Sequence, residues 1–437
     1  MKKTITLKTL MLVLVALFSI NASAYDYTFS AENAEGKTIY YKYDSTWGVL
    51  EVTKGEIKYA GNVIIPEEVK YLSSVRKVTS IGTSAFSNCS DLSYVTIPGT
   101  VTEIKDYAFQ MCSNLASIEI PNSVTRIGKS AFTSCKRLSS ATISNNVTSI
   151  GDGAFASCSS LTSIEIPNSV GKIGDQAFLL CSNLVSVTLG SNVQSIGVGA
   201  FASCSSLTSI EIPNSVKSIG YSAFSNCTAL ASVSLGNSLV SIGDFAFYSC
   251  IMPSIEIPRS VKSIGYGAFY TPDLMTVVSL SKTPAEIVQN EPTSNVDPFS
   301  KATYTNGTLY VPKGTLENYK KVRDWSAFKH IEEMEDPAPK CETPTVQYKD
   351  GKLYFECATE GVQYHIDIIG FSIDVTNEHV DFPKTFTIKV YAYKDEYDNS
   401  DEVTTTITVS RQTTDVNGDG SVDTQDVLEI YQYIQEH

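Results

Sequence analysis

The hydrophobic positions of the chain repeat with a fixed period between Val78 and Leu280. The clearest marker is an alanine followed by a phenylalanine, which recurs at steps of 23 residues with one final step of 22. The phenylalanines of this marker are Phe86, Phe109, Phe132, Phe155, Phe178, Phe201, Phe224, Phe247 and Phe269. A period of this length is typical of a solenoid, in which each coil buries its apolar face only against its neighbours.

One coil shows how the pattern predicts a strand along one side of such a solenoid. Leu161, Ile164 and Ile166 have the spacing of a short strand. Glu165 is expected to face away from the two isoleucines, because strand side chains alternate. Pro167 is expected to end the strand, since proline cannot donate a ladder hydrogen bond.

The rest of the same coil predicts an opposite side and a turn. Val170 and Ile173 are expected to point inward from the opposite side of the coil. Gly174 is expected to provide a turn with positive φ. Ala177 and Phe178 then close the coil, with a small side chain beside a large one.

A cysteine follows the phenylalanine by three positions in eight of the nine coils. These residues are Cys89, Cys112, Cys135, Cys158, Cys181, Cys204, Cys227 and Cys250. Stacked coils bring their Cα atoms about 4.8 Å apart, but parallel Cβ vectors do not suit relaxed disulfide geometry. We therefore expect buried, unpaired thiols with a packing role. A cysteine-based metal site is not expected, because no histidine lies near these positions.

The full motif of the repeat is C-x-x-L-x-x-I-x-I-P-x-x-V-x-x-I-G-x-x-A-F. It resembles the BspA-like leucine-rich repeat family over about 200 residues. The resemblance implies a leucine-rich-repeat solenoid and a mostly β fold. Members of that family are mostly surface or secreted proteins of bacteria that are linked to adhesion, so the resemblance also implies a protein that binds a protein or a glycan.

A second period lies on top of the first. The outward strand position alternates between glutamate and a hydroxyl residue along the coils: Thr96, Glu119, Thr142, Glu165, Thr188, Glu211, Ser234 and Glu256. Two interpretations remain open. The nearly identical segments 151–174 and 197–220 favour duplication of a two-coil unit, whereas a surface selected for a ligand would make Glu119, Glu165, Glu211 and Glu256 the candidate ligand face.

The first residues of the chain have the features of a secretory signal peptide. Lys2 and Lys3 give a positive start, residues 10–20 form an apolar core, and small residues precede an expected cleavage after Ala24. We therefore expect a secreted or cell-surface protein. No later stretch is long and apolar enough to predict a transmembrane helix.

Changes of pattern along the chain predict its organisation. The predicted segments are a signal peptide at 1–24, an N-terminal cap of short strands at 25–77, BspA-like leucine-rich repeats at 78–280, a C-terminal cap of the solenoid at 281–335, a linker at 336–340, a β-sandwich domain at 341–411 and a dockerin-like calcium-binding segment at 412–437. In the β-sandwich, alternation of period two and the Asp350-Gly351 turn predict a hairpin. Whether Cys341 and Cys357 form a disulfide stays open.

The last segment contains the spacing of a calcium loop. Oxygen ligands are expected at positions 1, 3, 5, 7, 9 and 12 of a twelve-residue loop: Asp415, Asn417, Asp419, Ser421 through its carbonyl, Asp423 through water, and Asp426. The loop with its following apolar helix stripe resembles a type I dockerin, which implies Ca²⁺ as the bound ion and a cohesin-like protein as a possible partner. Dockerins usually carry two such loops, and this chain has one.

The charge distribution and the lack of catalytic motifs in the sequence argue against two classes of function, nucleic-acid binding and catalysis. The net charge is −14, and residues 331–437 carry 23 acidic and 7 basic residues, so no basic patch indicates nucleic acid. No nucleophile motif accompanies the four histidines, so an enzyme is not expected. Two functions stay open. The protein is either an adhesion or interaction protein that binds a protein or glycan, or a component of a polysaccharide-degrading surface assembly that docks through its calcium-binding tail. A monomer is expected in both cases.

Overall fold

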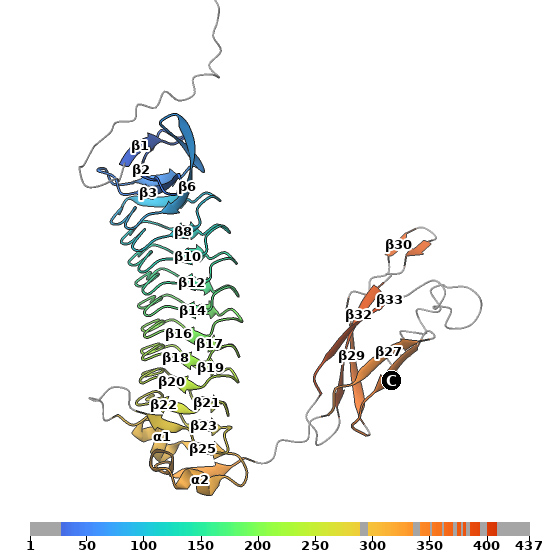
Figure 1. The fold of residues 1–437 in the computed structure, drawn as a ribbon. Helices are drawn as coiled ribbons and strands as arrows, with labels where there is room; N and C mark the ends of the chain where they lie inside the picture. The colour runs from blue at the N-terminus through green and yellow to red at the C-terminus, as the bar shows by residue number, and fades with distance from the viewer. Residues whose placement is uncertain are drawn as a thin grey trace, which may run out of the picture. The chain divides into compact units, whose positions relative to one another are not determined.

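The chain divides into two compact units, residues 1–334 and 335–437. The computed structural model describes the following residues: 28–288, 296–334, 341–349, 352–360, 362–369, 374–376, 379–381, 385–393 and 400–408. The predicted signal peptide, the linker at 336–340 and the calcium-binding segment at 412–437 lie outside these residues. The mostly β leucine-rich-repeat solenoid that the sequence predicted is confirmed in the first unit (Figure 1).

An N-terminal cap of short strands precedes the coils. Its strands are β1 Thr28–Glu32, β2 Thr38–Asp44, β3 Val49–Thr53, β4 Gly61–Ile64, β5 Glu68–Tyr71 and β6 Ser74–Ile81. Strands β1, β2 and β3 are antiparallel, whereas β3 pairs in parallel with β6, and β6 pairs in parallel with the first coil. Strand β6 therefore joins the antiparallel strands of the cap to the parallel strands of the coils.

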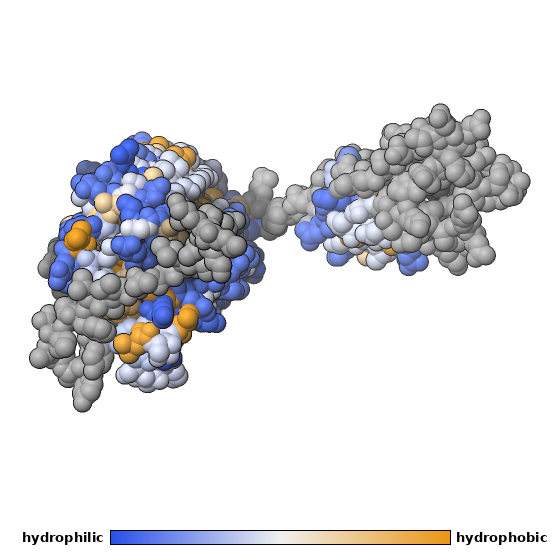
Figure 2. Space-filling view, turned by 90° about the horizontal axis from the view of Figure 1, so that it is seen from above, coloured by the Kyte–Doolittle hydropathy of each residue, from blue (hydrophilic) through white to orange (hydrophobic). Residues whose placement is uncertain are grey.

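The surface of this cap carries several exposed apolar side chains. Trp47 is 78% exposed, Ile57 72%, Leu72 65% and Val75 60%. Seen from the cap end in Figure 2, hydrophobic positions lie as separate spots among hydrophilic ones. Scattered apolar side chains of this kind are normal on protein surfaces and do not mark a binding site.

Two walls of parallel strands run along the coils. The first wall continues from β6 through β8 Glu103–Ile104, β10 Arg126–Ile127, β12 Ser149–Ile150, β14 Lys172–Ile173, β16 Ser195–Ile196, β18 Ser218–Ile219, β20 Ser241–Ile242, β22 Ser263–Gly265 and β24 Glu286–Val288. The second wall contains β4 and then β7 Leu92–Thr96, β9 Ser117–Glu119, β11 Ser140–Thr142, β13 Ser163–Glu165, β15 Ser186–Thr188, β17 Ser209–Glu211, β19 Ser232–Ser234, β21 Ser254–Ile257 and β23 Thr276–Ser279. Val170 and Ile173 are fully buried, which confirms the inward side of the first wall.

The third side of each coil, called the turn side below, runs from the glycine of the motif to the cysteine. Its backbone alternates between turns within one coil and hydrogen bonds to the next: Ala177 N donates to Gly174 O, and Phe178 N donates to Ala200 O. Left-handed residues stand before each alanine and before each cysteine, for example Gln176 with φ 57° and Leu180 with φ 61°.

The prediction that Gly174 supplies positive φ is wrong. The left-handed residue is Gln176, two positions later. Gly174 is required for close approach instead, because a Cβ there would lie 2.6 Å from the backbone nitrogen of Asp152 and the carbonyl carbon of Gly151. Backbones of neighbouring coils therefore touch at this point, and no other residue leaves enough room.

The phenylalanines form one stacked column through the core. Neighbouring rings from Phe86 to Phe269 have centroids 4.8 to 5.6 Å apart and planes within 9° of parallel. Tyr59 of the cap packs against the first ring at 4.4 Å with the planes tilted by 39°, and Phe299 stacks on the last ring at 5.7 Å. The eight cysteines lie beside this column and are buried, as predicted.

The solenoid continues past Leu280 with irregular spacing. Its last elements are α1 Lys301–Asn306, β25 Thr308–Val311, α2 Leu316–Lys320, α3 Arg323–Ser326 and β26 His330–Glu333. Strands β25 and β26 extend the second wall in parallel with β23. Trp325 and Phe328 are buried over Phe299, which closes the apolar end as the sequence indicated.

The second unit is antiparallel β, as expected of a small β-sandwich. Its strands are β27 Thr345–Lys349, β28 Lys352–Glu356, β29 Gln363–Ile369, β30 Asp374–Thr376, β31 His379–Asp381, β32 Thr385–Tyr393 and β33 Val403–Thr408. Lys349 pairs with Lys352, so a two-residue connection joins the predicted hairpin. Cys341 and Cys357 are both free thiols here, and Cys357 Sγ donates to Glu342 O at 3.0 Å.

Candidate functional site

The four glutamates of the candidate ligand face lie in one column on the second wall. Glu119, Glu165, Glu211 and Glu256 are all exposed, and each stands in the strand beside a buried isoleucine. The register fixes their neighbours along the stack, since Glu119 pairs with Thr142, Glu165 with Thr188 and Glu211 with Ser234. We call this set of four carboxylates the acidic column.

The structure extends the same register beyond the repeats. Glu256 pairs with Val278, Val278 with Tyr310, and Tyr310 with Glu332, which is exposed. The sequence did not indicate Glu332, because the spacing between the last strands is irregular. The only signal was the Ile-Glu pair at 331–332, which repeats the Ile-Glu pair of the coils.

The two-coil period has a packing basis in the structure. Strands of the second wall pair as β9 with β11, β13 with β15, and β17 with β19, and no ladder joins one pair to the next. Pro167 of one coil lies against Gly190 of the next, where a Cβ would be 2.5 Å from the proline carbonyl oxygen. Gly236 meets Pro213 in the same way at 2.4 Å. A coil with proline therefore packs closely against a following coil with glycine at the same position. This pairing favours duplication of a two-coil unit as the origin of the two-coil period.

Packing does not explain the glutamates themselves. In the described part of the chain, none of the four side chains forms a hydrogen bond or an ion pair. Carboxylates two coils apart are separated by about 10 Å, which is twice the spacing of stacked strands. Repulsion at this distance is weak in water. The column is therefore a regular row of available anionic acceptors with exposed hydroxyls between them.

The first wall differs, because its carboxylates near the cap are paired. Lys105 binds Glu51, and Arg126 binds Glu103 and also lies 3.6 Å from Asp106. These ion pairs link successive coils along the wall. They satisfy the acidic groups locally, so this wall does not present a row of unpaired carboxylates at its N-terminal end.

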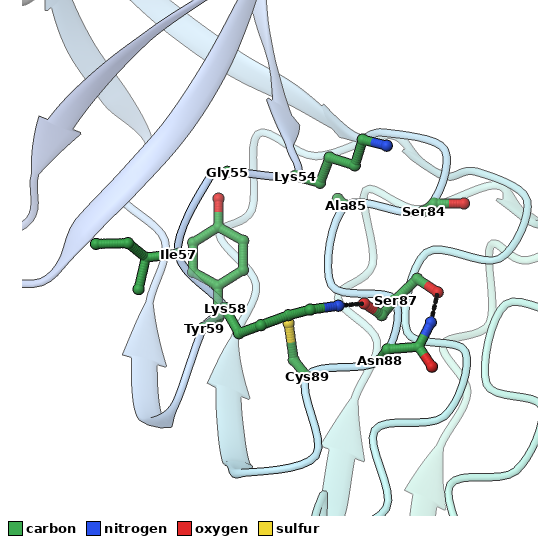
Figure 3. A pocket seen from close by; sticks show the side chains of 10 residues that line it. All are labelled: Lys54, Gly55, Ile57, Lys58, Tyr59, Ser84, Ala85, Ser87, Asn88 and Cys89. Atoms are coloured by element: carbon green, nitrogen blue, oxygen red, sulfur yellow. Dashed lines mark hydrogen bonds between the residues drawn. The ribbon is translucent and has the colours of Figure 1, made fainter.

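A pocket of about 270 Å³ lies where the cap meets the first coil (Figure 3). The cap loop forms one side with Lys54, Gly55, Ile57, Lys58 and Tyr59, and the turn side forms the other with Ser84, Ala85, Ser87, Asn88 and Cys89. Lys58 Nζ spans the mouth and donates to Ser87 O at 3.0 Å. Burial raises the pKa of Cys89 to about 11, so its thiol is protonated at neutral pH. The lining residues include no carboxylate or histidine, so they offer no acid-base pair.

The metal and catalytic predictions meet the structure only in part. The predicted calcium ligands Asp415, Asn417, Asp419, Ser421, Asp423 and Asp426 lie outside the described residues. Across the described ranges, no group of three or more His, Cys, Asp or Glu side chains could hold a metal ion. None of the helices in those ranges is long and apolar enough to cross a membrane.

Comparisons with known proteins agree with this geometry. Six copies of the family described as BspA type Leucine rich repeat region match the chain, over residues 67–185, 148–276 and 194–323. No curated protein matches it. A solved leucine-rich repeat protein from Bacteroides ovatus is 30% identical with a TM-score of 0.54, and the match covers 68% of this chain and 75% of that chain.

Two further solved structures are similar. A leucine rich cell surface protein from Faecalibacterium prausnitzii is 25% identical with a TM-score of 0.46, over 70% of this chain and 95% of that chain. The leucine rich repeat protein of T. pallidum is 30% identical with a TM-score of 0.41, over 46% of this chain and 91% of that chain. Because the repeat family matches more than half of the sequence, the chain belongs to the BspA-type leucine-rich repeat family.

Proposed function

We propose that this protein is a bacterial cell-surface interaction protein that binds a protein ligand through the acidic column. Proteins of the BspA-type family are typically at the cell surface and are repeat proteins without a catalytic site, which supports an adhesion role. The observation that carries the proposal is the exposure of four unpaired carboxylates in one register.

The chemistry of the column favours basic side chains of a protein over a glycan. Regularly spaced carboxylates accept charge-assisted hydrogen bonds from lysine and arginine. Between Thr96 and Glu256 the outward position carries only Thr, Ser and Glu, without a ring on which a sugar could stack. The strands of this wall carry two aromatic side chains beyond that span: Tyr94, which is 36% exposed in β7, and Tyr310 of β25, which follows Val278 in the register.

The test compares two variants with the same change of charge. In the first, Glu119, Glu165, Glu211 and Glu256 become Gln. In the second, four exposed glutamates elsewhere become Gln: Glu35, Glu56, Glu68 and Glu286. Binding is measured on immobilised extracellular-matrix proteins, a surface that presents many basic side chains. Loss of binding in the first variant alone supports the acidic column, whereas equal binding by the first variant and the wild type contradicts it.

A second proposal concerns the tail. We propose that residues 415–426 bind one Ca²⁺ and that the protein is exported by the signal peptide at 1–24. The spacing of oxygen-bearing residues supports the first point, and the charged start with an apolar core supports the second. A cohesin-like partner for this tail would place the protein in a polysaccharide-degrading surface assembly, which is the alternative function.

A further inference from the structure

Five aromatic side chains gather on the turn side of the last three repeats. They are Tyr221, Phe245, Tyr248, Tyr266 and Tyr270. Tyr221 is 41% exposed and Tyr270 is 37% exposed, while the other three are half-buried. We call these five residues the aromatic cluster. It is separate from the stacked phenylalanine column, whose rings are buried in the core.

Four of the five rings form a chain of contacts across the repeats. The centroids of Tyr221 and Phe245 are 5.8 Å apart, those of Phe245 and Tyr248 are 5.6 Å apart, and both pairs meet edge to face. Tyr248 stacks on Tyr270 of the following repeat at 5.7 Å. The cluster is therefore a continuous surface over three coils.

The fold of the coil does not require these rings. At the position of Phe245, the other eight repeats carry Ser84, Tyr107, Ser130, Gly153, Gln176, Gly199, Ser222 and Gly267. At the position of Tyr248 and Tyr270, the earlier repeats carry Ser87, Gln110, Thr133, Ala156, Leu179, Ala202 and Ser225. Small or polar side chains satisfy the same backbone in most repeats, so the rings serve something other than coil formation.

Phe245 adopts a backbone conformation that bulky residues rarely take. Its φ is 56°, in the left-handed region where glycine is favoured. Its ring extends over the next repeat, where a Cβ on Gly267 would lie 2.6 Å from two ring carbons. The neighbouring repeat therefore leaves room for the ring. The left-handed conformation belongs to this position in all nine repeats, so the room that Gly267 leaves for the ring is what sets Phe245 apart.

The cluster is uncharged and rich in hydroxyl groups. The turn-side segments 221–227, 244–250 and 266–271 contain one carboxylate, Asp244, which is 1% exposed and accepts a hydrogen bond from Tyr266 N at 3.0 Å. The hydroxyl groups of its four tyrosines form no hydrogen bond within the described ranges. Asp297 borders the cluster on its C-terminal side, where its carbonyl accepts from Gly267 N.

We propose that the aromatic cluster binds a neutral polysaccharide. The C–H faces of pyranose rings pack on aromatic rings, and sugar hydroxyls can bond to the four free tyrosine hydroxyls. An uncharged surface matches an uncharged polymer, whereas an acidic polysaccharide would meet the carboxylate of Asp297 at the margin. The site lies on the turn side and the acidic column lies on the second wall, so the two sites bind independently.

The test is affinity electrophoresis of the full chain through gels that contain a defined polymer. The neutral probes are xyloglucan, galactomannan and soluble starch, and the acidic probe is polygalacturonate. We expect at least one neutral polymer to slow the chain and polygalacturonate to leave it unaffected. Replacing Tyr221, Tyr248 and Tyr270 with Ala should weaken that binding about ten-fold or more. Tyr107→Ala is the control for loss of a turn-side tyrosine outside the cluster, in an early repeat.

The outcomes separate this proposal from the alternatives. Three results would overturn it: no retardation by any neutral polymer, equal retardation by polygalacturonate, or unchanged retardation of the triple variant. Loss of matrix-protein binding in the triple variant, without any polysaccharide binding by the wild type, would assign the cluster to a protein partner instead. Tyr270→Ser, which alters one exposed side chain, replaces the triple variant if the latter does not fold. The Gln variant of the acidic column should bind the polymer as the wild type does.

Discussion

The thiol of Cys158 donates a hydrogen bond of 3.2 Å to the carbonyl oxygen of Phe132, which belongs to the preceding coil. The same bond recurs in the following coils, for example from Cys181 to Phe155 and from Cys204 to Phe178. Each cysteine therefore anchors its own coil to the phenylalanine backbone of the coil before it. This relationship explains why the two residues keep a fixed spacing through the repeats.

Burial of these thiols predicts a loss of stability at high pH. Desolvation raises the pKa of Cys181 and of Cys227 from 9.0 to about 12. In the unfolded chain the thiols ionise near pH 9, so their contribution to stability is complete below pH 9 and is lost as pH rises toward 12. The melting temperature should therefore fall above pH 9.

The matched comparison is Cys181→Ala with Cys227→Ala. This double variant should show a shallower fall in melting temperature between pH 9 and 11, because two of the ionising groups are gone. Buried tyrosines contribute equally to both proteins and cancel in the difference. Identical slopes for the variant and the wild type would show that the thiols ionise as easily in the folded state as in the unfolded one.

The stacked phenylalanine rings predict a large loss of stability when one of them is truncated to alanine. Phe178 is fully buried between Phe155 at 5.4 Å and Phe201 at 5.1 Å. Phe178→Ala should lower the free energy of unfolding by about 3–5 kcal/mol through lost burial and the cavity that remains. Chemical denaturation measures the change. A loss below about 1 kcal/mol would mean that the coils close without the ring.

Two glycines of one coil are required for different reasons, one for close packing between coils and the other for its backbone conformation. A Cβ on Gly197 would lie 2.7 Å from backbone atoms of the preceding coil, whereas a Cβ on Gly199 would meet nothing nearer than 3.6 Å, although its φ is 58°. Gly199→Ala should cost about 1 kcal/mol because of its left-handed conformation. Gly197→Ala should cost clearly more, because the coils must move apart. Denaturation curves that rank the two variants in the opposite order would contradict this assignment.

These glycines also show which features of the fold could be predicted from the sequence and which could not. The period of Phe178 and its equivalents predicted the coil, the inward side chains and the buried cysteines, because burial follows directly from hydrophobic spacing. Gly174 was misassigned because a glycine that recurs in most repeats can reflect either positive φ or close approach, and only the neighbouring coil distinguishes them. Glu332 and Phe299 were missed because the last coils lose the 23-residue spacing while keeping the register. The packing of Pro167 against Gly190 likewise depends on contacts between coils, which no single coil reveals.

The calcium loop remains a prediction, and calorimetry tests it. Residues 415–426 should bind one Ca²⁺, because bound ion offsets the repulsion among the four aspartates of the loop, and Mg²⁺ should bind less well because it requires tighter octahedral geometry. Asp415→Ala with Asp419→Ala should remove the response. Asp395→Ala with Asp398→Ala is the control for lost charge outside the loop. Absence of calcium-specific heat at millimolar ion would contradict the site.

The acidic column is tested most directly by the pair of Gln variants that carry the same net charge. Binding to immobilised matrix proteins is measured by surface plasmon resonance at low and at physiological salt, because ionic contacts weaken as salt rises. The variant at Glu119, Glu165, Glu211 and Glu256 should bind at least about ten-fold more weakly than the wild type, a change of about 1.4 kcal/mol. The variant with the same substitutions elsewhere on the surface should bind as the wild type does. Equal weakening of both variants would contradict a specific site, since it would show that net charge alone governs the interaction.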